Sequence, residues 1–224
     1  MNTDLMRTNE ITAFMNPDFY PHPVAKIAFI ETHISYVFLT GKFVYKLKKP
    51  LKLDFIDYST LSRRQECCEQ EVRLNRRYAP DYYLGVVSVA TDKQGQLCLN
   101  KSADIVDYAV KMKQFPDNCV LFDLMPTYQN ELNFFELLGQ EVAEFHLALP
   151  PIALASDYGE PETIFQAMKD NFTAINRIDE RQRLQDLGRW TEDQFKHLEE
   201  ALRQRKRDGF IRDCHGDLHL GNIA

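Results

Sequence analysis

One stretch near the end of the chain decides its fold: Cys214-His215-Gly216-Asp217-Leu218-His219-Leu220-Gly221-Asn222. It reads H-G-D-x-H-x-x-N, with an acidic side chain at position 217 and a carboxamide five positions later. Carboxylate oxygens accept protons, and carboxylate and carboxamide oxygens both bind hard divalent cations. The stretch therefore predicts a catalytic loop rather than a surface turn that is rich in His, Gly and Asp by chance.

The spacing of Asp217 and Asn222 matches loops that transfer phosphoryl groups. In the kinase pattern H-R-D-x-x-x-x-N, the Asp accepts the proton of the attacking hydroxyl, and the Asn binds magnesium on the nucleotide phosphates. We therefore predict that Asp217 is the catalytic base and that Asp217 and Asn222 are magnesium ligands. We expect His215 to brace the loop and His219 to donate a hydrogen bond near the transferred phosphate. The predicted cofactors are ATP and Mg²⁺.

The same loop allows a second interpretation. His215, Asp217 and His219 alternate as H-x-D-x-H, and imidazole with carboxylate is a common ligand set of metal-dependent hydrolases. That interpretation leaves Asn222 and the lysines upstream of it without a role. Phosphoryl transfer is therefore the favoured chemistry.

A strand pattern supplies the phosphate-binding lysine that a kinase site also needs. In an extended strand Val44, Lys46 and Lys48 share one face. In the kinase motif V-A-I-K the Ala lies two residues before the Lys, and Val44 has that relation to Lys46. We therefore predict Lys46 as the phosphate-binding lysine, with Lys48 as the other candidate. The helix that follows should supply its glutamate partner, Glu71 in preference to Glu69.

Two further segments are candidates for nucleotide binding. The turn at residues 31–35 reads Glu-Thr-His-Ile-Ser and contains no glycine. The hydroxyl groups of Thr32 and Ser35 could nevertheless donate hydrogen bonds to phosphate. The backbone around Met112 is predicted to contact the edge of the adenine, whereas the Met112 side chain by itself is typical of core packing.

The first 115 residues have the pattern of an antiparallel sheet with one major helix. Apolar and β-branched runs predict strands at residues 27–30, 36–39, 43–48, 83–89, 97–99 and 108–112. We interpret them as a five-stranded sheet. A short helix is expected at 3–15 and the major helix at 61–78, which Ser59 or Thr60 could cap and which ends before Pro80.

The chain becomes helical after residue 115. Capping-box patterns at Asn133 with Glu136 and at Thr191 with Gln194, and a proline at 161, predict helices at 133–149, at 161–178 and from 191 to Gly209. We expect an N-lobe at 1–115 and a partial helical C-lobe at 116–224. The predicted fold class is α+β, with the two-lobed architecture of a protein kinase.

Composition limits the remaining functional classes. The 224 residues carry 27 Lys and Arg against 33 Asp and Glu, a net charge of −6, which argues against broad nucleic-acid binding. The N-terminus has no secretory pattern and no run of about 18 apolar residues occurs. Five cysteines without a C-x-x-C pair are typical of reduced thiols. We therefore predict a cytoplasmic protein that binds neither nucleic acid nor membrane.

At these residues the chain resembles a known family. H-G-D-L-H-L-G-N is similar to the catalytic loop of aminoglycoside phosphotransferase-like kinases. Three blocks of the chain are similar to a narrower bacterial group of that family. They are residues 31–50 (ETHISYVFLTGKFVYKLKKP), 54–61 (DFIDYSTL) and 71–87 (EVRLNRRYAPDYYLGVV). The similarity runs from about residue 24 to residue 224.

The resemblance implies a protein-kinase-like fold, with Asp217 as base, Asn222 on magnesium and Lys46 as the phosphate clamp. It implies ATP-dependent phosphorylation of a hydroxyl on a small molecule, and in this group the domain is often fused to a P-loop ATPase or kinase domain. The alternative is an inactive nucleotide-binding or regulatory module that works with a fused or separate P-loop ATPase domain.

The family has a second metal-binding Asp downstream of the catalytic loop, and this chain ends at residue 224. We therefore expect a C-lobe that is truncated there, negligible kinase turnover by the chain alone, and apolar surface where further helices would pack.

Overall fold

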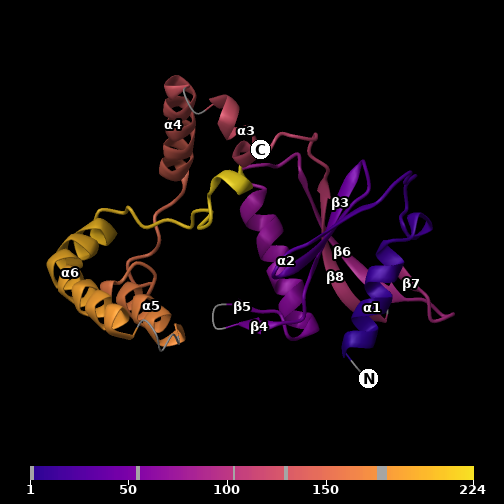
Figure 1. Ribbon diagram of the computed structural model, residues 1–224, viewed down its shortest axis with the longest axis horizontal. Coiled ribbons are helices and arrows are strands. Elements are labelled where there is room, and N and C mark those ends of the chain that lie inside the picture. The colour runs from indigo at the N-terminus through magenta and orange to yellow at the C-terminus, as the bar shows by residue number, and fades with distance from the viewer. Residues whose placement is uncertain (1–2, 54–55, 103, 129–130, 176–180) are drawn as a thin grey trace. The chain divides into compact units, whose positions relative to one another are not determined.

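The computed structural model describes residues 3–53, 56–102, 104–128, 131–175 and 181–224. It shows an α+β protein built on an antiparallel sheet (Figure 1). The sheet has the order β1-β2-β3-β8-β6-β7, and each neighbouring pair is antiparallel. Its strands are β1 (Ala28–Glu31), β2 (Ser35–Leu39), β3 (Phe43–Lys48), β6 (Tyr83–Thr91), β7 (Leu97–Leu99) and β8 (Ile105–Lys113). A separate two-stranded ribbon consists of β4 (Lys52–Leu53) and β5 (Ile56–Asp57).

One face of the sheet packs against the N-terminal segment. Helix α1 (Thr3–Phe14) and the short 3₁₀ helix η1 (Pro17–Phe19) place aromatic side chains on it. Phe14 is fully buried and stacks on Phe38 with ring centroids 4.7 Å apart. Alternation along β3 puts Tyr45 and Leu47 into the same cluster. This face therefore carries an aromatic and aliphatic core.

The other face of the sheet packs against α2 (Leu61–Asn75), which lies along the sheet in Figure 1. The helix begins at a Thr60 cap, whose side chain accepts a hydrogen bond from the Arg63 N–H. Arg64, Cys68 and Val72 recur every four residues and are buried against the sheet. One stripe of α2 therefore packs against β6 and β8, next to the strand β3 that carries the candidate lysines.

A buried ion pair ties α2 to the sheet. Arg64 Nε donates to Asp107 Oδ1 on β8 at 2.8 Å, and Asp107 is completely buried. A second guanidinium nitrogen of Arg64 donates to the Tyr58 carbonyl at 3.1 Å. A buried charge pair needs such additional hydrogen bonds to offset its desolvation, so the position of α2 on the sheet is fixed by directional contacts as well as by packing.

The predicted elements of the first part are confirmed with two differences. The helices at 3–15 and 61–78 and the strands all form, within a few residues of the expected bounds. The main sheet has six strands rather than five, because Leu97–Leu99 pairs with Val89–Thr91 at its edge. The β4–β5 ribbon was not predicted.

The later helices are α3 (Leu121–Tyr128), α4 (Leu132–Ala148), α5 (Pro161–Ala174) and α6 (Arg181–Arg207). Pro161 opens α5 as expected. The capping box at Asn133 is wrong, because α4 begins at Leu132 and its cap residue, Glu131, makes no side-chain capping bond. The box at Thr191 is also wrong, because Thr191 lies inside the 27-residue α6. The end of the predicted helix at 178 lies outside the described residues.

The end of α6 and the next glycine behave as predicted. Gly209 has φ +74, a left-handed conformation that favours glycine after a helix. Its N–H donates to the Lys206 carbonyl at 3.0 Å, and the Phe210 N–H donates to the Arg205 carbonyl at 2.9 Å. The helix therefore stops where the chain turns toward the predicted catalytic loop.

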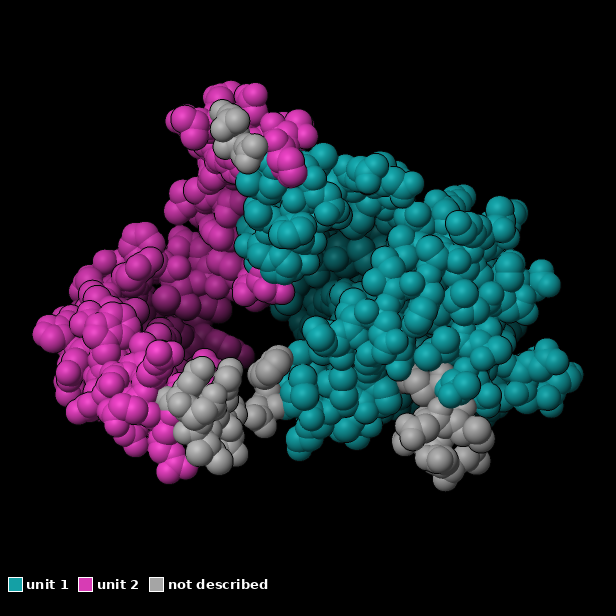
Figure 2. Space-filling view, viewed as in Figure 1, with its two compact units in different colours: residues 1–125, 218–224 teal, residues 126–217 magenta. Residues whose placement is uncertain are grey.

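The chain forms two compact units (Figure 2). The first contains residues 1–125 and 218–224, and the second contains residues 126–217. The boundary falls inside α3, next to its internal Pro126. It lies ten residues beyond the predicted lobe boundary at 115, and the last seven residues of the chain belong with the sheet unit.

Helix length and polarity bear on membrane insertion. Within the described ranges, every helix is too short or too polar to cross a bilayer.

Candidate functional site

The centre of the candidate site is one carboxylate that contacts two lysines. Glu71 on α2 accepts a hydrogen bond from Lys46 Nζ at 2.9 Å through Oε1. Its other oxygen, Oε2, accepts a hydrogen bond from Lys48 Nζ. The lysines reach the same residue because they lie two positions apart on β3 and therefore point to the same side of the sheet.

Glu71 is the partner that the sequence predicted in preference to Glu69. It is one residue before Val72 on the buried stripe of α2, whereas Glu69 is exposed and accepts a hydrogen bond from Gln65 at 2.9 Å. The structure does not separate the two candidate lysines by this contact, because Lys46 and Lys48 both donate to the Glu71 carboxylate. The predicted pair of strand lysine and helix glutamate is thus present, with one lysine more than expected.

Burial and neighbouring charges shift the pKa values of Glu71 and Lys48 in opposite directions. Burial raises the pKa of the Glu71 carboxyl, but the nearby ammonium groups of Lys46 and Lys48 outweigh it and hold that pKa below its ordinary value. Burial lowers the pKa of Lys48, and Glu71 outweighs that effect, so the pKa of Lys48 is raised overall. Glu71 and Lys48 are therefore both charged at neutral pH.

The two lysines differ in their access to solvent. The Lys48 side chain is 5% exposed and its Nζ lies 5.3 Å from the centre of the Tyr58 ring. The Lys46 side chain is 29% exposed. Lys46 is therefore the lysine of the pair that a ligand can reach from solvent.

The predicted phosphate turn at 31–35 uses its polar groups internally. Thr32 Oγ1 donates to the Ser35 carbonyl at 3.0 Å and accepts from the Ser35 N–H at 2.9 Å. Ser35 is fully buried, and its hydroxyl has no hydrogen-bond partner in the described structure. Its register partner across the sheet is Lys48, so it lies on the lysine-bearing face. The Thr32 hydroxyl therefore already donates its proton within the turn and the Ser35 hydroxyl is enclosed, so neither is available to donate to a phosphate in this conformation.

Met112 lies in the core beside the lysine strand. Its side chain is buried with Val44, Val72 and Val110. Its register partners are Val44 on β3 and Tyr83 on β6, so its strand is flanked on both sides. The strand ends at Lys113. The structure therefore shows Met112 as a core residue with a strand on each side, and the predicted contact of its backbone with adenine stays a prediction.

The predicted catalytic loop is an irregular segment. Gly216 has φ +78, a left-handed conformation that glycine adopts at low cost. Beside it, the Asp217 N–H donates to Nδ1 of His215 at 3.3 Å. The bracing role of His215 stays a prediction. Both His215 and Asp217 belong to the second compact unit.

The last residues of the loop belong to the first compact unit and form a small turn. Nδ1 of His219 accepts a hydrogen bond from the Gly221 N–H at 3.1 Å, and the Asn222 carboxamide lies 3.0 Å from Nε2 of the same ring. The Leu121 N–H donates to the Ile223 carbonyl at 2.8 Å. The sequence did not predict that His219 would order Asn222, although their three-residue spacing is the signal that could have suggested it.

The hydrolase interpretation finds no support in the structure. In the ranges that the structure describes, which include His215, Asp217 and His219, no three His, Cys, Asp or Glu side chains gather closely enough to hold a metal ion. The residues that fit magnesium in the kinase interpretation, Asp217 and Asn222, both carry the oxygen ligands that Mg²⁺ prefers.

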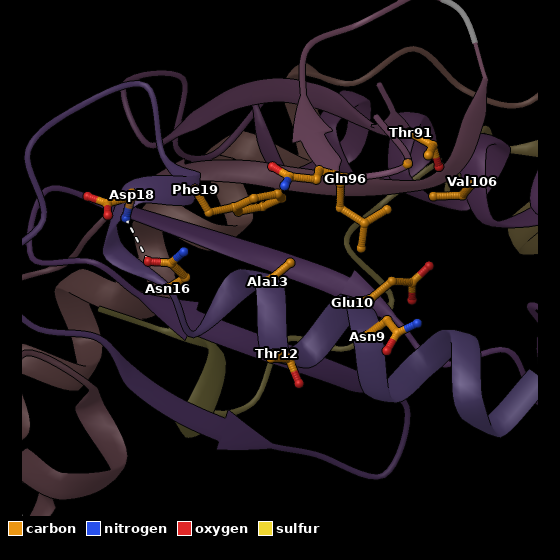
Figure 3. Close-up of a pocket in the computed structure, with 12 residues that line it drawn as sticks. Asn9, Glu10, Thr12, Ala13, Asn16, Asp18, Phe19, Thr91, Gln96 and Val106 are labelled. Carbon is orange, nitrogen blue, oxygen red and sulfur yellow. Dashed lines mark hydrogen bonds between the residues drawn. The ribbon is translucent and has the colours of Figure 1, made fainter. Parts of the chain in front are cut away.

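A large pocket lies on the opposite face of the sheet, between α1 and the β6–β7 hairpin (Figure 3). Its volume is about 730 Å³. It is lined by Asn9, Glu10, Thr12, Ala13, Asn16, Asp18, Phe19, Thr91, Gly95, Gln96, Leu97 and Val106. These residues include two carboxylates and no cationic side chain, so the pocket is electrostatically unsuited to a polyphosphate. The lysine cluster is the better candidate for a phosphate group, because two ammonium groups lie there.

Comparison with known proteins gives distant relatives. The chain is 26% identical over 209 residues to Uncharacterized protein Rv2004c of Mycobacterium tuberculosis and to Uncharacterized protein Mb2027c of Mycobacterium bovis. The matched region covers 90% of this chain and 40% of each relative, so the chain spans about two fifths of their length. No protein-family model and no solved structure matches the chain.

Proposed function

We propose that this chain is the nucleotide-binding and catalytic-loop part of an ATP-dependent phosphotransferase that acts on a hydroxyl of a small molecule. The observation that carries the proposal is the 2.9 Å contact between Lys46 on β3 and Glu71 on α2. A lysine on the third strand paired with a glutamate on the next helix is the phosphate-holding device of kinases. We further propose the protein-kinase-like fold and membership of the aminoglycoside phosphotransferase-like family.

The proposed chemistry assigns one role to each group. Lys46, oriented by Glu71, would hold the α- and β-phosphates. Asp217 would orient the acceptor hydroxyl and take its proton as the new O–P bond forms and the bond to the β-phosphate oxygen breaks. Magnesium, held by Asp217 and Asn222, would neutralise charge on the phosphates. The sequence motif supports the last two roles, and the Lys46–Glu71 contact supports the first.

A nucleotide-binding or regulatory module without turnover is the second candidate. The turn at 31–35 favours it, because the hydroxyls of Thr32 and Ser35 are not presented as phosphate donors. The relatives are much longer than the matched region. This length leaves room in them for a further domain, such as the P-loop ATPase domain that we propose as a partner. We also propose a cytoplasmic location, on the sequence evidence alone.

The test measures nucleotide binding and phosphoryl transfer separately, on this chain and on the full product of its gene. The assays are calorimetric titration with MgATP and release of ADP in the presence of a panel of amino alcohols and aminoglycosides. The Asp217→Asn variant should lose at least about a hundredfold in transfer, the scale of a lost general base, and only part of its MgATP affinity, because Asn222 remains as a proposed magnesium ligand.

Lys46→Met should instead lose MgATP affinity, and the exposed Glu69→Gln on α2 serves as the matched control. Transfer that persists unchanged in the Asp217→Asn variant would overturn the proposed mechanism. Tight MgATP binding with no transfer by either polypeptide would favour the regulatory module.

A further inference from the structure

The cluster of Lys46, Lys48 and Glu71 has an excess of one positive charge. Two ammonium groups contact one carboxylate, so the formal charges of these three side chains add up to +1. In a simple lysine–glutamate pair the two charges would cancel. A cluster with a net positive charge attracts a phosphate group, whereas a neutral pair does so only through its dipole.

The two lysines differ in burial and in the Glu71 oxygen that each contacts. Lys48 is almost completely enclosed, beneath α2 and beside the Tyr58 ring, and it contacts Oε2 of Glu71. Lys46 contacts the other oxygen from a position that is open to solvent. An ammonium group has three N–H donors, so Lys46 can donate to Glu71 and to a ligand at the same time.

We propose that Lys48 is a positioning residue that neutralises Glu71 from the protein interior, so that the positive charge of Lys46 remains available to the phosphates of a nucleotide. The inference rests on the proposed nucleotide site and assigns within it a residue that the V-A-I-K comparison does not provide. Without Lys48, Lys46 would serve as the main counter-ion of a nearly buried carboxylate. Its attraction for phosphate would then be reduced.

The experiment compares the affinities for MgATP and for adenosine, which has the same base and ribose but no phosphate. Lys48→Met should lower the MgATP affinity by about tenfold and leave the adenosine affinity unchanged, because the loss concerns charge alone. The double variant Lys48→Met/Glu71→Gln removes one charge of each sign and restores the sum of +1. The glutamine carboxamide oxygen can still accept the hydrogen bond from Lys46, so we expect the MgATP affinity of the double variant to return to within about twofold of the wild type.

This recovery separates charge compensation from a purely structural role. If Lys48 only supported the fold, or if it bound phosphate directly, the second substitution would not restore the affinity. Lys111→Met is the matched control, because it removes a lysine from the Tyr45 face of the sheet, where Lys111 Nζ lies 4.2 Å from the Phe43 ring centre. Lys111→Met should leave the ratio of the MgATP affinity to the adenosine affinity unchanged.

The outcomes distinguish the two proposals. A wild-type chain that binds neither MgATP nor adenosine overturns the nucleotide site and the role of Lys48 together. Binding by the wild type with no loss in Lys48→Met, or with no recovery in the double variant, overturns only the role of Lys48. Thermal unfolding shows whether Lys48→Met folds. If it does not, the double variant alone decides, because affinity near the wild-type value supports the proposal and weak binding contradicts it.

Discussion

Glu71 keeps its charge in the interior because two ammonium groups contact it. Its pKa in the folded protein lies below the ordinary value of about 4.3 that applies to the unfolded chain. A carboxyl of this kind stabilises the fold at pH values above the unfolded pKa, and the stabilisation is lost as the pH falls through the folded pKa. The charge of Glu71 should therefore contribute to stability at neutral pH and not in acid.

We predict that Glu71→Gln lowers the free energy of unfolding at pH 7 by roughly 1–3 kcal/mol, since it leaves two lysines without their shared carboxylate. The difference from the wild type should shrink as the pH falls below about 4. Urea unfolding between pH 3 and pH 7 measures it. Glu69→Gln, on the exposed side of the same helix, should show little difference at any pH. A pH-independent difference for Glu71→Gln would contradict the electrostatic explanation.

At this scale the sequence predicted the correct glutamate and did not separate the lysines. Glu71 could be chosen because it adjoins Val72 in the buried stripe of the helix. Lys46 and Lys48 share one face of β3, and side-chain alternation cannot distinguish residues two positions apart. Their difference in burial depends on where α2 lies along the strand, which is a tertiary property.

At the scale of elements, the contact between α2 and the sheet depends on Arg64. Its guanidinium is buried and donates to the fully buried Asp107 carboxylate and to the Tyr58 carbonyl. We predict that Arg64→Ala lowers the free energy of unfolding by about 3–5 kcal/mol, because it leaves a buried carboxylate without its charged partner. Urea unfolding monitored by circular dichroism measures the loss.

The neighbouring residue provides a control for that prediction. Arg63 pairs with Asp57 at the protein surface, where ion pairs contribute little to stability. Arg63→Ala should therefore leave the unfolding midpoint nearly unchanged. If Arg64→Ala lowered the free energy of unfolding as little as Arg63→Ala, the buried ion pair would be dispensable and the apolar stripe alone would hold α2 on the sheet.

The elements themselves were predictable where one local signal dominated. Thr60 does cap α2 and Gly209 does follow the end of α6, because a cap and a left-handed glycine act within a few residues. The start of α6 was missed, because Thr191 with Gln194 imitates a capping box in the middle of a long helix. The α3 helix has a proline in its interior, and such a proline normally argues against a helix.

At the scale of the whole molecule, the later helices leave large apolar side chains in solvent. Leu132 is 81% exposed, Leu147 is 64% exposed and Trp190 is 59% exposed, and all three lie on α4 or α6. The apolar surface expected in the helical part is therefore present. Exposed apolar side chains that form contiguous patches promote association, because burying them against another surface releases hydration water.

We predict that this chain self-associates with increasing concentration and that the triple variant Leu132→Gln/Leu147→Gln/Trp190→Gln does so less. Sedimentation velocity over a hundredfold range of concentration measures the association. The variant should keep the thermal unfolding midpoint of the wild type, since the three side chains contribute little to the core. Lys196→Gln, an exposed change on α6, should associate like the wild type. A wild-type chain that stays monomeric at the highest concentration would show that these side chains do not bind one another.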